Sequence, residues 1–132
     1  MVSFTRTITH ADVESFSAVS GDLNPLHTDD QYASSTRYER RTAHGMLVAA
    51  PFSMMAGHFL PGRRCVLIDM RSSFVHPVYP GDTLTYRGEI IQISAAMQVL
   101  KVDTQVTNQD AVPVLRGGYT AQVMPASSEA TN

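Results

Sequence analysis

Hydrophobic positions follow two different periods along the chain, one in each half. In the first half, the apolar residues Val13, Phe16 and Val19 recur every three residues, which is the spacing of one helix face. Thr9, followed three residues later by an aspartate, has the pattern of a capping box, and Gly21 stands where a left-handed cap closes a helix. This pattern predicts a helix of about three turns that ends before Gly21.

The stretch after this helix predicts a turn and then a short second helix. The pair Asn24-Pro25 favours a turn, and its proline has no backbone donor. A short helix is expected from about Asp29 to Ser34. We therefore expect Asp22 and His27 to lie on a loop.

The segment from Gly45 to about Leu60 is apolar on nearly every side. This pattern is typical of a helix that is enclosed by the rest of the protein. Pro51 lies inside the segment, and an interior proline removes one helical hydrogen bond. The sequence therefore predicts a central helix with a kink or broken turn between Leu47 and Pro51, ending at Pro61-Gly62.

Beyond residue 62 the pattern changes to strands that are separated by turn residues. The connections are short, which favours antiparallel neighbours, and Gly117-Gly118 predicts a bulge or a close backbone approach. An antiparallel run after a very apolar helix predicts an α+β domain in which a curved sheet wraps that helix. We expect one domain over residues 1–125 and a disordered tail at 126–132. The four predicted strands are Cys65 to Val75, Thr83 to Ser94, Met97 to Asn108 and Val112 to Met124.

Composition excludes several classes of protein. The 132 residues contain 43% hydrophobic positions and a net charge of −2, which is ordinary for one globular domain. A single cysteine, Cys65, excludes an internal disulfide and a cysteine-based zinc cluster. The ten cationic residues form no basic block, so nucleic-acid binding is disfavoured. The longest apolar run is shorter than the ~20 residues of a membrane helix, and no signal-peptide pattern opens the chain, so we expect a soluble cytoplasmic protein.

Two stretches carry a family resemblance. Residues 16–33 read FSAVSGDLNPLHTDDQYA and residues 43–62 read AHGMLVAAPFSMMAGHFLPG. They resemble the two signature motifs of the MaoC-like (R)-specific enoyl-CoA hydratases, also called the hydratase 2 family, and the similarity runs from about Phe4 to Met124. The resemblance implies a hot-dog fold, a homodimer or larger oligomer, and an acyl-CoA or acyl carrier protein thioester as substrate. It implies neither a metal nor another cofactor.

The chemistry of such a hydratase can be matched to particular residues. Hydration of a 2-enoyl thioester needs a base to take a proton from water and an acid to protonate the α carbon, and an Asp22/His27 pair can supply both. Negative charge on the thioester oxygen needs a donor, and the resemblance assigns this task to the backbone N–H of Gly45 and assigns the dyad to Asp22 and His27. It also places Ser53 near the site, and Asn24 would then brace the loop. We expect Asn24, Ser53 and Met46 to contact the substrate.

Other interpretations stay open at this point. The same dyad suits a polyketide tailoring dehydratase or cyclase of secondary metabolism, while a non-catalytic acyl-thioester-binding protein and a thioesterase are further alternatives. His44 is expected either to cap the central helix or to orient the loop. Met54 or Met55 is expected to form part of an acyl tunnel. A group of arginines is either a solvated face or a site for coenzyme A phosphates or an acidic carrier protein: Arg37, Arg40, Arg41, Arg63 and Arg64.

Overall fold

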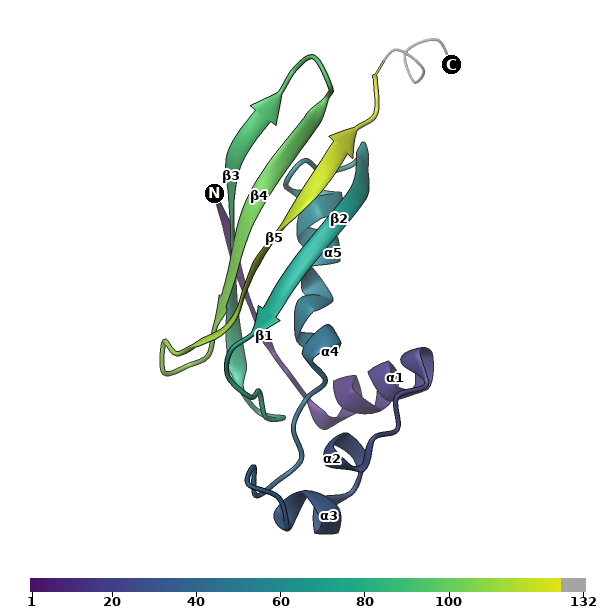
Figure 1. Ribbon diagram of the computed structural model, residues 1–132, viewed down its shortest axis with the longest axis vertical. Helices are drawn as coiled ribbons and strands as arrows, with labels where there is room; N and C mark the ends of the chain where they lie inside the picture. The colour runs from purple at the N-terminus through teal and green to yellow at the C-terminus, as the bar shows by residue number, and fades with distance from the viewer. Residues whose placement is uncertain (127–132) are drawn as a thin grey trace.

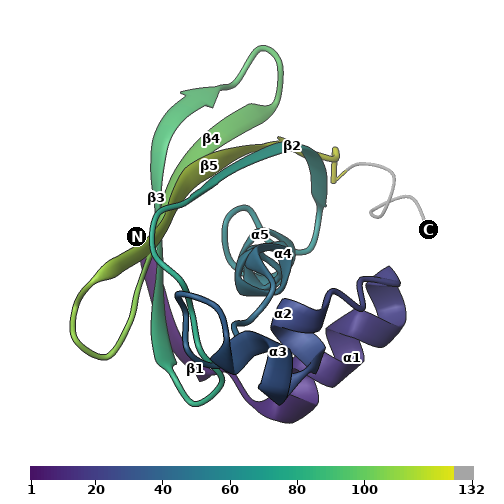
Figure 2. The ribbon, with the colours of Figure 1, turned by 60° about the horizontal axis from the view of Figure 1, so that its bottom comes forward.

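A five-stranded antiparallel sheet curves around a two-part helix (Figures 1 and 2). This computed structural model describes residues 1–126. The strand order is β1-β3-β4-β5-β2, so β1 and β2 are the two edges. The strands are β1 (Val2–Thr7), β2 (Cys65–Phe74), β3 (Thr83–Ser94), β4 (Val99–Thr107) and β5 (Pro113–Val123). The helices are α1 (His10–Ser20), α2 (Pro25–Thr28), α3 (Asp30–Ser34), α4 (Gly45–Ala49) and α5 (Pro51–His58).

The predicted α+β class and its four strands are confirmed, with each strand end within two residues of its predicted position. Strand β1 was missed, because six residues with only two apolar side chains, Val2 and Phe4, carry a weak pattern. It pairs antiparallel with β3, and the ring of Phe4 stacks on that of Tyr86 with 5.1 Å between centroids. The expected tail lies, except for Ala126, outside the described residues, and the domain boundary stays a prediction.

Helix α1 begins and ends as predicted. Thr9 forms a capping box with Asp12, and Gly21 closes the helix with φ +79°. The predicted apolar face is wrong at Val19, which is 84% exposed, whereas Ser17 is buried. Ser17 faces inward because its hydroxyl contacts the ring of His44, a partner that hydrophobic periodicity does not reveal.

The expected loop at His27 is also wrong, since this residue lies in the short helix α2. The Asn24 side chain caps α2 by accepting a hydrogen bond from the N–H of Leu26 at 2.9 Å, and Pro25 occupies the first turn. Proline is well tolerated there because the N–H that it lacks has no intrahelical partner. The sequence therefore builds a helical turn at the point where we expected a loop.

The central helix is interrupted as predicted: α4 ends at Ala49 and α5 starts at Pro51. Figure 2 shows both parts enclosed between the sheet and α1–α3. The Tyr86 hydroxyl donates to the Val48 carbonyl at 2.7 Å, which ties the helix to β3. Met55 is fully buried above Gly88, where an added Cβ would overlap the Met55 sulfur, so Met55 packs in the core, and its part in an acyl tunnel stays a prediction.

Gly117 confirms the predicted close backbone approach, since a Cβ there would overlap the carbonyl oxygen of Arg71 on β2. The irregularities in strand register lie elsewhere: between Leu67 and Asp69, between Ile90 and Gln92, and between Val106 and Thr107. In residues 1–126 we find no helix with the length and apolar character needed to cross a membrane. The expected cytoplasmic location stays a prediction.

Candidate functional site

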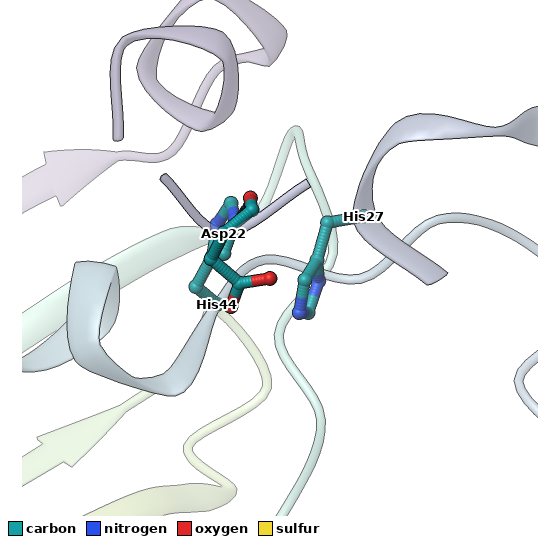
Figure 3. Close-up of side chains that lie close together, drawn as sticks. All are labelled: Asp22, His27 and His44. Carbon is teal, nitrogen blue, oxygen red and sulfur yellow. Dashed lines mark hydrogen bonds between the residues drawn. The ribbon is translucent and has the colours of Figure 1, made fainter. Parts of the chain in front are cut away.

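Asp22, His27 and His44 meet where α1, α2 and α4 converge (Figure 3). Asp22 follows the left-handed cap of α1, His27 lies on α2, and His44 directly precedes α4. One carboxylate oxygen and one ring nitrogen from each histidine lie within 4.8 Å of one another. The structure therefore brings together both members of the predicted dyad, and it adds a third titratable side chain to them.

The His27 ring is held in one orientation by the backbone. Its Nδ1 lies 2.7 Å from the carbonyl oxygen of Thr42. Because a carbonyl oxygen only accepts hydrogen bonds, Nδ1 carries a hydrogen, and in the neutral form of the ring the lone pair is therefore on Nε2. Figure 3 shows the Asp22 carboxylate turned toward this ring. Half-buried His27 thus presents a basic nitrogen beside a carboxylate, which is the arrangement that acid–base chemistry needs.

The loop that carries Asp22 is braced by local hydrogen bonds. The Asp22 carboxylate accepts from the N–H of Asn24 at 3.0 Å, and its own N–H donates to the Ser20 hydroxyl at 3.1 Å. Asn24 in turn caps α2, the helix that carries His27. These short-range contacts fix the carboxylate and the imidazole relative to each other.

His44 lies behind this pair and is only 2% exposed. Its Nε2 is 3.1 Å from the Ser17 hydroxyl and 3.2 Å from the backbone carbonyl oxygen of Asp22. The carbonyl requires a donor, so Nε2 carries the hydrogen, and Nδ1 is a buried nitrogen without a hydrogen-bond partner in the described part of the chain. His44 is the N-cap residue of α4, but its side chain makes no capping hydrogen bond, so the expected side-chain cap is wrong. The side chain instead contacts the Asp22 loop, as the alternative expected.

Burial lowers the pKa of His44 below its usual value. The electrostatic interaction with His27 lowers this pKa further. The hydrogen bond to the Asp22 carbonyl, which is the second-largest effect, and the charge of the Asp22 carboxylate both raise the pKa, but burial outweighs them. The pKa of His44 therefore favours a neutral ring. A neutral ring at this place contacts the Asp22 loop without adding a positive charge next to His27.

Gly45 begins α4 directly after His44. A Cβ on Gly45 would come within 3.0 Å of the Phe74 ring, so the absence of a side chain lets this ring cover the start of the helix. A cavity of about 480 Å³ opens here, bounded by Thr42, Gly45, Val48 and residues 74–78. Thr42, whose carbonyl holds His27, lines this cavity, whereas Asp22 and His27 themselves are not among its lining residues.

The other predicted substrate residues do not line this cavity. Ser53 is exposed on α5, and Met46 is 71% exposed on α4. Met54 is also exposed on α5. These side chains lie on an open face of the central helix, so their contact with substrate stays a prediction.

The three titratable groups offer two nitrogens and a carboxylate, which are possible metal ligands. Tetrahedral zinc, with bonds of about 2.0–2.1 Å, places its ligand atoms ~3.3 Å apart. The candidate ligand atoms here spread over as much as 4.8 Å, and Nε2 of His44 is already engaged by Ser17 and Asp22. A metal would require the side chains to move, whereas the arrangement as it stands is a hydrogen-bonded acid–base site.

Sequence reasoning missed the part that Thr42 plays in this site, and it left the role of His44 between two alternatives. Thr42 acts through its backbone carbonyl, which leaves no side-chain signature. His44 directly precedes Gly45 in the second sequence motif, and this position indicates that it lies near the site. Its contact with Ser17 could not be predicted, because it depends on the packing of α1 against α4.

Comparison with known proteins shows the family to which the chain belongs. The family model described as a MaoC like domain matches residues 2–112. An (R)-specific enoyl-CoA hydratase from Aeromonas caviae is 35% identical over 107 residues, which cover 81% of this chain and 80% of that protein. An (R)-specific enoyl-CoA hydratase from Rhodospirillum rubrum is 39% identical over 83 residues, which cover 63% of this chain and 58% of that protein.

Solved structures give the same result. The (R)-hydratase from A. caviae superimposes with a TM-score of 0.89 at 30% identity, covering 93% of each chain. An R-hydratase from Pseudomonas aeruginosa gives a TM-score of 0.87 at 33% identity, covering 92% of this chain and 78% of that one. The hot-dog fold is thereby confirmed, and the chain belongs to the MaoC-like domain family.

Proposed function

We propose that this protein is an (R)-specific enoyl-thioester hydratase that also catalyses the reverse dehydration of 3-hydroxyacyl thioesters. The observation that carries this proposal is the free Nε2 of His27, fixed by the Thr42 carbonyl and placed beside the Asp22 carboxylate. The curated relatives named above are (R)-specific hydratases, and other similar proteins are named 3-hydroxybutyryl-CoA dehydratase and 3-hydroxyacyl-[acyl-carrier-protein] dehydratase. All of these names describe the addition or removal of one water, which makes the protein a hydro-lyase.

In the proposed reaction the pair works on a single water. Nε2 of His27 takes one proton as the water oxygen bonds to the β carbon, and the electron pair of the double bond moves toward the thioester oxygen. The Asp22 carboxylate accepts the second hydrogen of the water in a hydrogen bond and stabilises the imidazolium. The imidazolium then returns its proton to the α carbon, so the enzyme ends in its starting protonation state. Dehydration follows the same steps in reverse.

The start of α4 provides the proposed site for the thioester oxygen. The first N–H groups of a helix have no intrahelical partner and attract negative charge. Gly45 occupies that position without a side chain between its N–H and the cavity. Its backbone N–H is the proposed donor to the enolate-like oxygen, an interaction typically worth about 2.7–4 kcal/mol in such sites.

We also propose that the active form is a homodimer joined along β2. This strand is an edge of the sheet, so one row of its backbone groups has no neighbouring strand in the monomer. Apolar side chains are unusually exposed along and just beyond it, at 42–52% of their surface: Val66, Leu67, Ile68, Phe74 and Val75. Pairing with a second β2 would satisfy the edge and cover these side chains, together with the open face of α5.

A panel of acyl-CoA thioesters, analysed by mass spectrometry after incubation, tests the function. A 2-enoyl thioester should gain the mass of one water, and a 3-hydroxyacyl thioester should lose it. Release of free coenzyme A would instead indicate a thioesterase. An unchanged panel with demonstrable binding would indicate a non-catalytic thioester-binding protein, and turnover of carrier-bound polyketides alone would favour the tailoring dehydratase.

A further inference from the structure

Two arginines project from the loop between α3 and α4, next to the cavity that ends at Gly45. Arg37 and Tyr38 line this cavity together with Gly45 and the apolar side chains of Val48 and Val114. Arg40 follows three residues after Arg37 on the same loop, and it is not itself among the lining residues. We call Arg37 and Arg40, with the tyrosines that hold them, the arginine rim of the cavity.

Tyrosine rings hold both guanidinium groups of the arginine rim. Arg37 lies 4.9 Å from the centroid of the Tyr38 ring and donates to the Tyr38 hydroxyl at 2.7 Å. Arg40 lies 4.0 Å from the centroid of the Tyr79 ring, and the Tyr79 hydroxyl donates to the Tyr38 carbonyl at 3.1 Å. A tyrosine ring orients a guanidinium but does not neutralise its charge. The rim is therefore braced across two chain segments with its positive charge intact.

No carboxylate of residues 1–126 forms an ion pair with Arg37 or Arg40. Within residues 1–126, the arginines that form ion pairs are Arg6, Arg41 and Arg71. Arg41, which is adjacent to Arg40, binds Asp30 at 2.7 Å. Glu39, the acid between the rim arginines, forms an ion pair with neither of them in this range. On this loop, Arg41 has a carboxylate partner, whereas Arg37 and Arg40 form no ion pair within residues 1–126 and could bind an anionic ligand.

We propose that the arginine rim binds the phosphates of the coenzyme A portion of the substrate, and this inference rests on the proposed function. Guanidinium groups match phosphate oxygens in charge and in hydrogen-bond geometry. The cavity has the volume of an ordinary small-molecule site. Its Gly45 end receives the thioester, and its arginine end receives the charged end of the carrier. The site therefore recognises free coenzyme A thioesters, and an acidic carrier-protein surface is the competing ligand.

Binding of adenosine 3′,5′-bisphosphate tests the rim without any turnover. This probe carries phosphates but no thioester, so its binding does not depend on catalysis. Calorimetry should show that R37A/R40A weakens binding by about tenfold, the scale of losing a hydrogen bond to a charged group. The matched control is R116A, an exposed arginine on β5, which should bind as the parent does. Equal affinity in the parent and R37A/R40A, or no binding by the parent, would overturn the proposal.

Kinetics with two thioesters provide a second, independent test. The parent should prefer crotonyl-CoA to crotonyl-pantetheine, which lacks the nucleotide phosphates, and R37A should reduce this preference in kcat/KM by about five- to tenfold. An equal loss with both substrates would show that Arg37 shapes the pocket, which contradicts phosphate binding. A parent that uses only a carrier-protein thioester would also contradict it. If the parent binds the bisphosphate but hydrates no thioester, the proposed function is refuted, while phosphate binding by the arginine rim remains supported.

Discussion

The imidazole of His27 lies against the imidazole of His44, with 4.0 Å between ring centroids and 31° between ring planes. In the proposed reaction His27 becomes positively charged for part of each cycle. A second cation at this distance would oppose that step. Burial lowers the pKa of His44, so its ring stays neutral while His27 changes its charge.

His44→Phe separates the stacking of the ring from its hydrogen bond. Phenylalanine keeps an aromatic ring beside His27 but cannot donate to the Asp22 carbonyl, which His44 contacts at 3.2 Å. A small displacement of the Asp22 loop should lower kcat by roughly ten- to hundredfold, with little change in KM. Steady-state kinetics with crotonyl-CoA check this, and a thermal melt confirms that the variant folds. Parental kcat in the folded variant would show that His44 is only a packing residue.

The lowered pKa of His44 also predicts how stability depends on pH. The unfolded chain binds a proton near the ordinary value of 6.5, while the folded protein resists protonation at this residue. Stability is therefore highest above the unfolded value and falls as the pH drops below it. Urea unfolding at about pH 7.5 and about pH 5.5 should show a larger loss in the parent than in His44→Phe. Equal losses in the two proteins would argue against a neutral, buried His44.

The sequence predicted the local parts of this fold better than its long-range contacts. The capping box at Thr9 and the left-handed Gly21 depend on neighbouring residues, so they could be recognised. The pairing of β1 with β3 joins residues about 80 positions apart and left only a weak pattern. Likewise, Asp22 and His27 could be read from one motif, whereas the contact between Ser17 and His44 spans 27 positions and needs the assembled helices.

A charge on the β2 edge should separate the proposed dimer. Ile68, 52% exposed on β2, is the residue to change, because lysine there would be buried without a partner at the interface. Light scattering should give a dimer mass for the parent and a monomer mass for Ile68→Lys. Val19→Lys, at an exposed position on α1, is the matched control and should remain dimeric. A monomeric parent at micromolar concentration would refute the dimer.

Removal of either member of the dyad should abolish most of the activity. Asp22→Asn and His27→Gln keep the approximate size of each side chain but remove the carboxylate or the basic nitrogen. Each should reduce turnover of crotonyl-CoA by at least about a hundredfold, the scale of general acid–base catalysis. The matched controls Asp110→Asn and His58→Gln change exposed residues and should retain parental turnover. Near-parental turnover in either dyad variant would remove that residue from the mechanism.

The configuration of the product tests the central claim most directly, because it reports both the reaction and the face of the substrate to which the pair delivers water. Purified protein should convert crotonyl-CoA to 3-hydroxybutyryl-CoA, and chiral chromatography of the released acid should show the (R) enantiomer. The same assay with Asp22→Asn and His27→Gln should show only trace product. An (S) product, a racemic product, or no hydration by the parent protein would contradict the account.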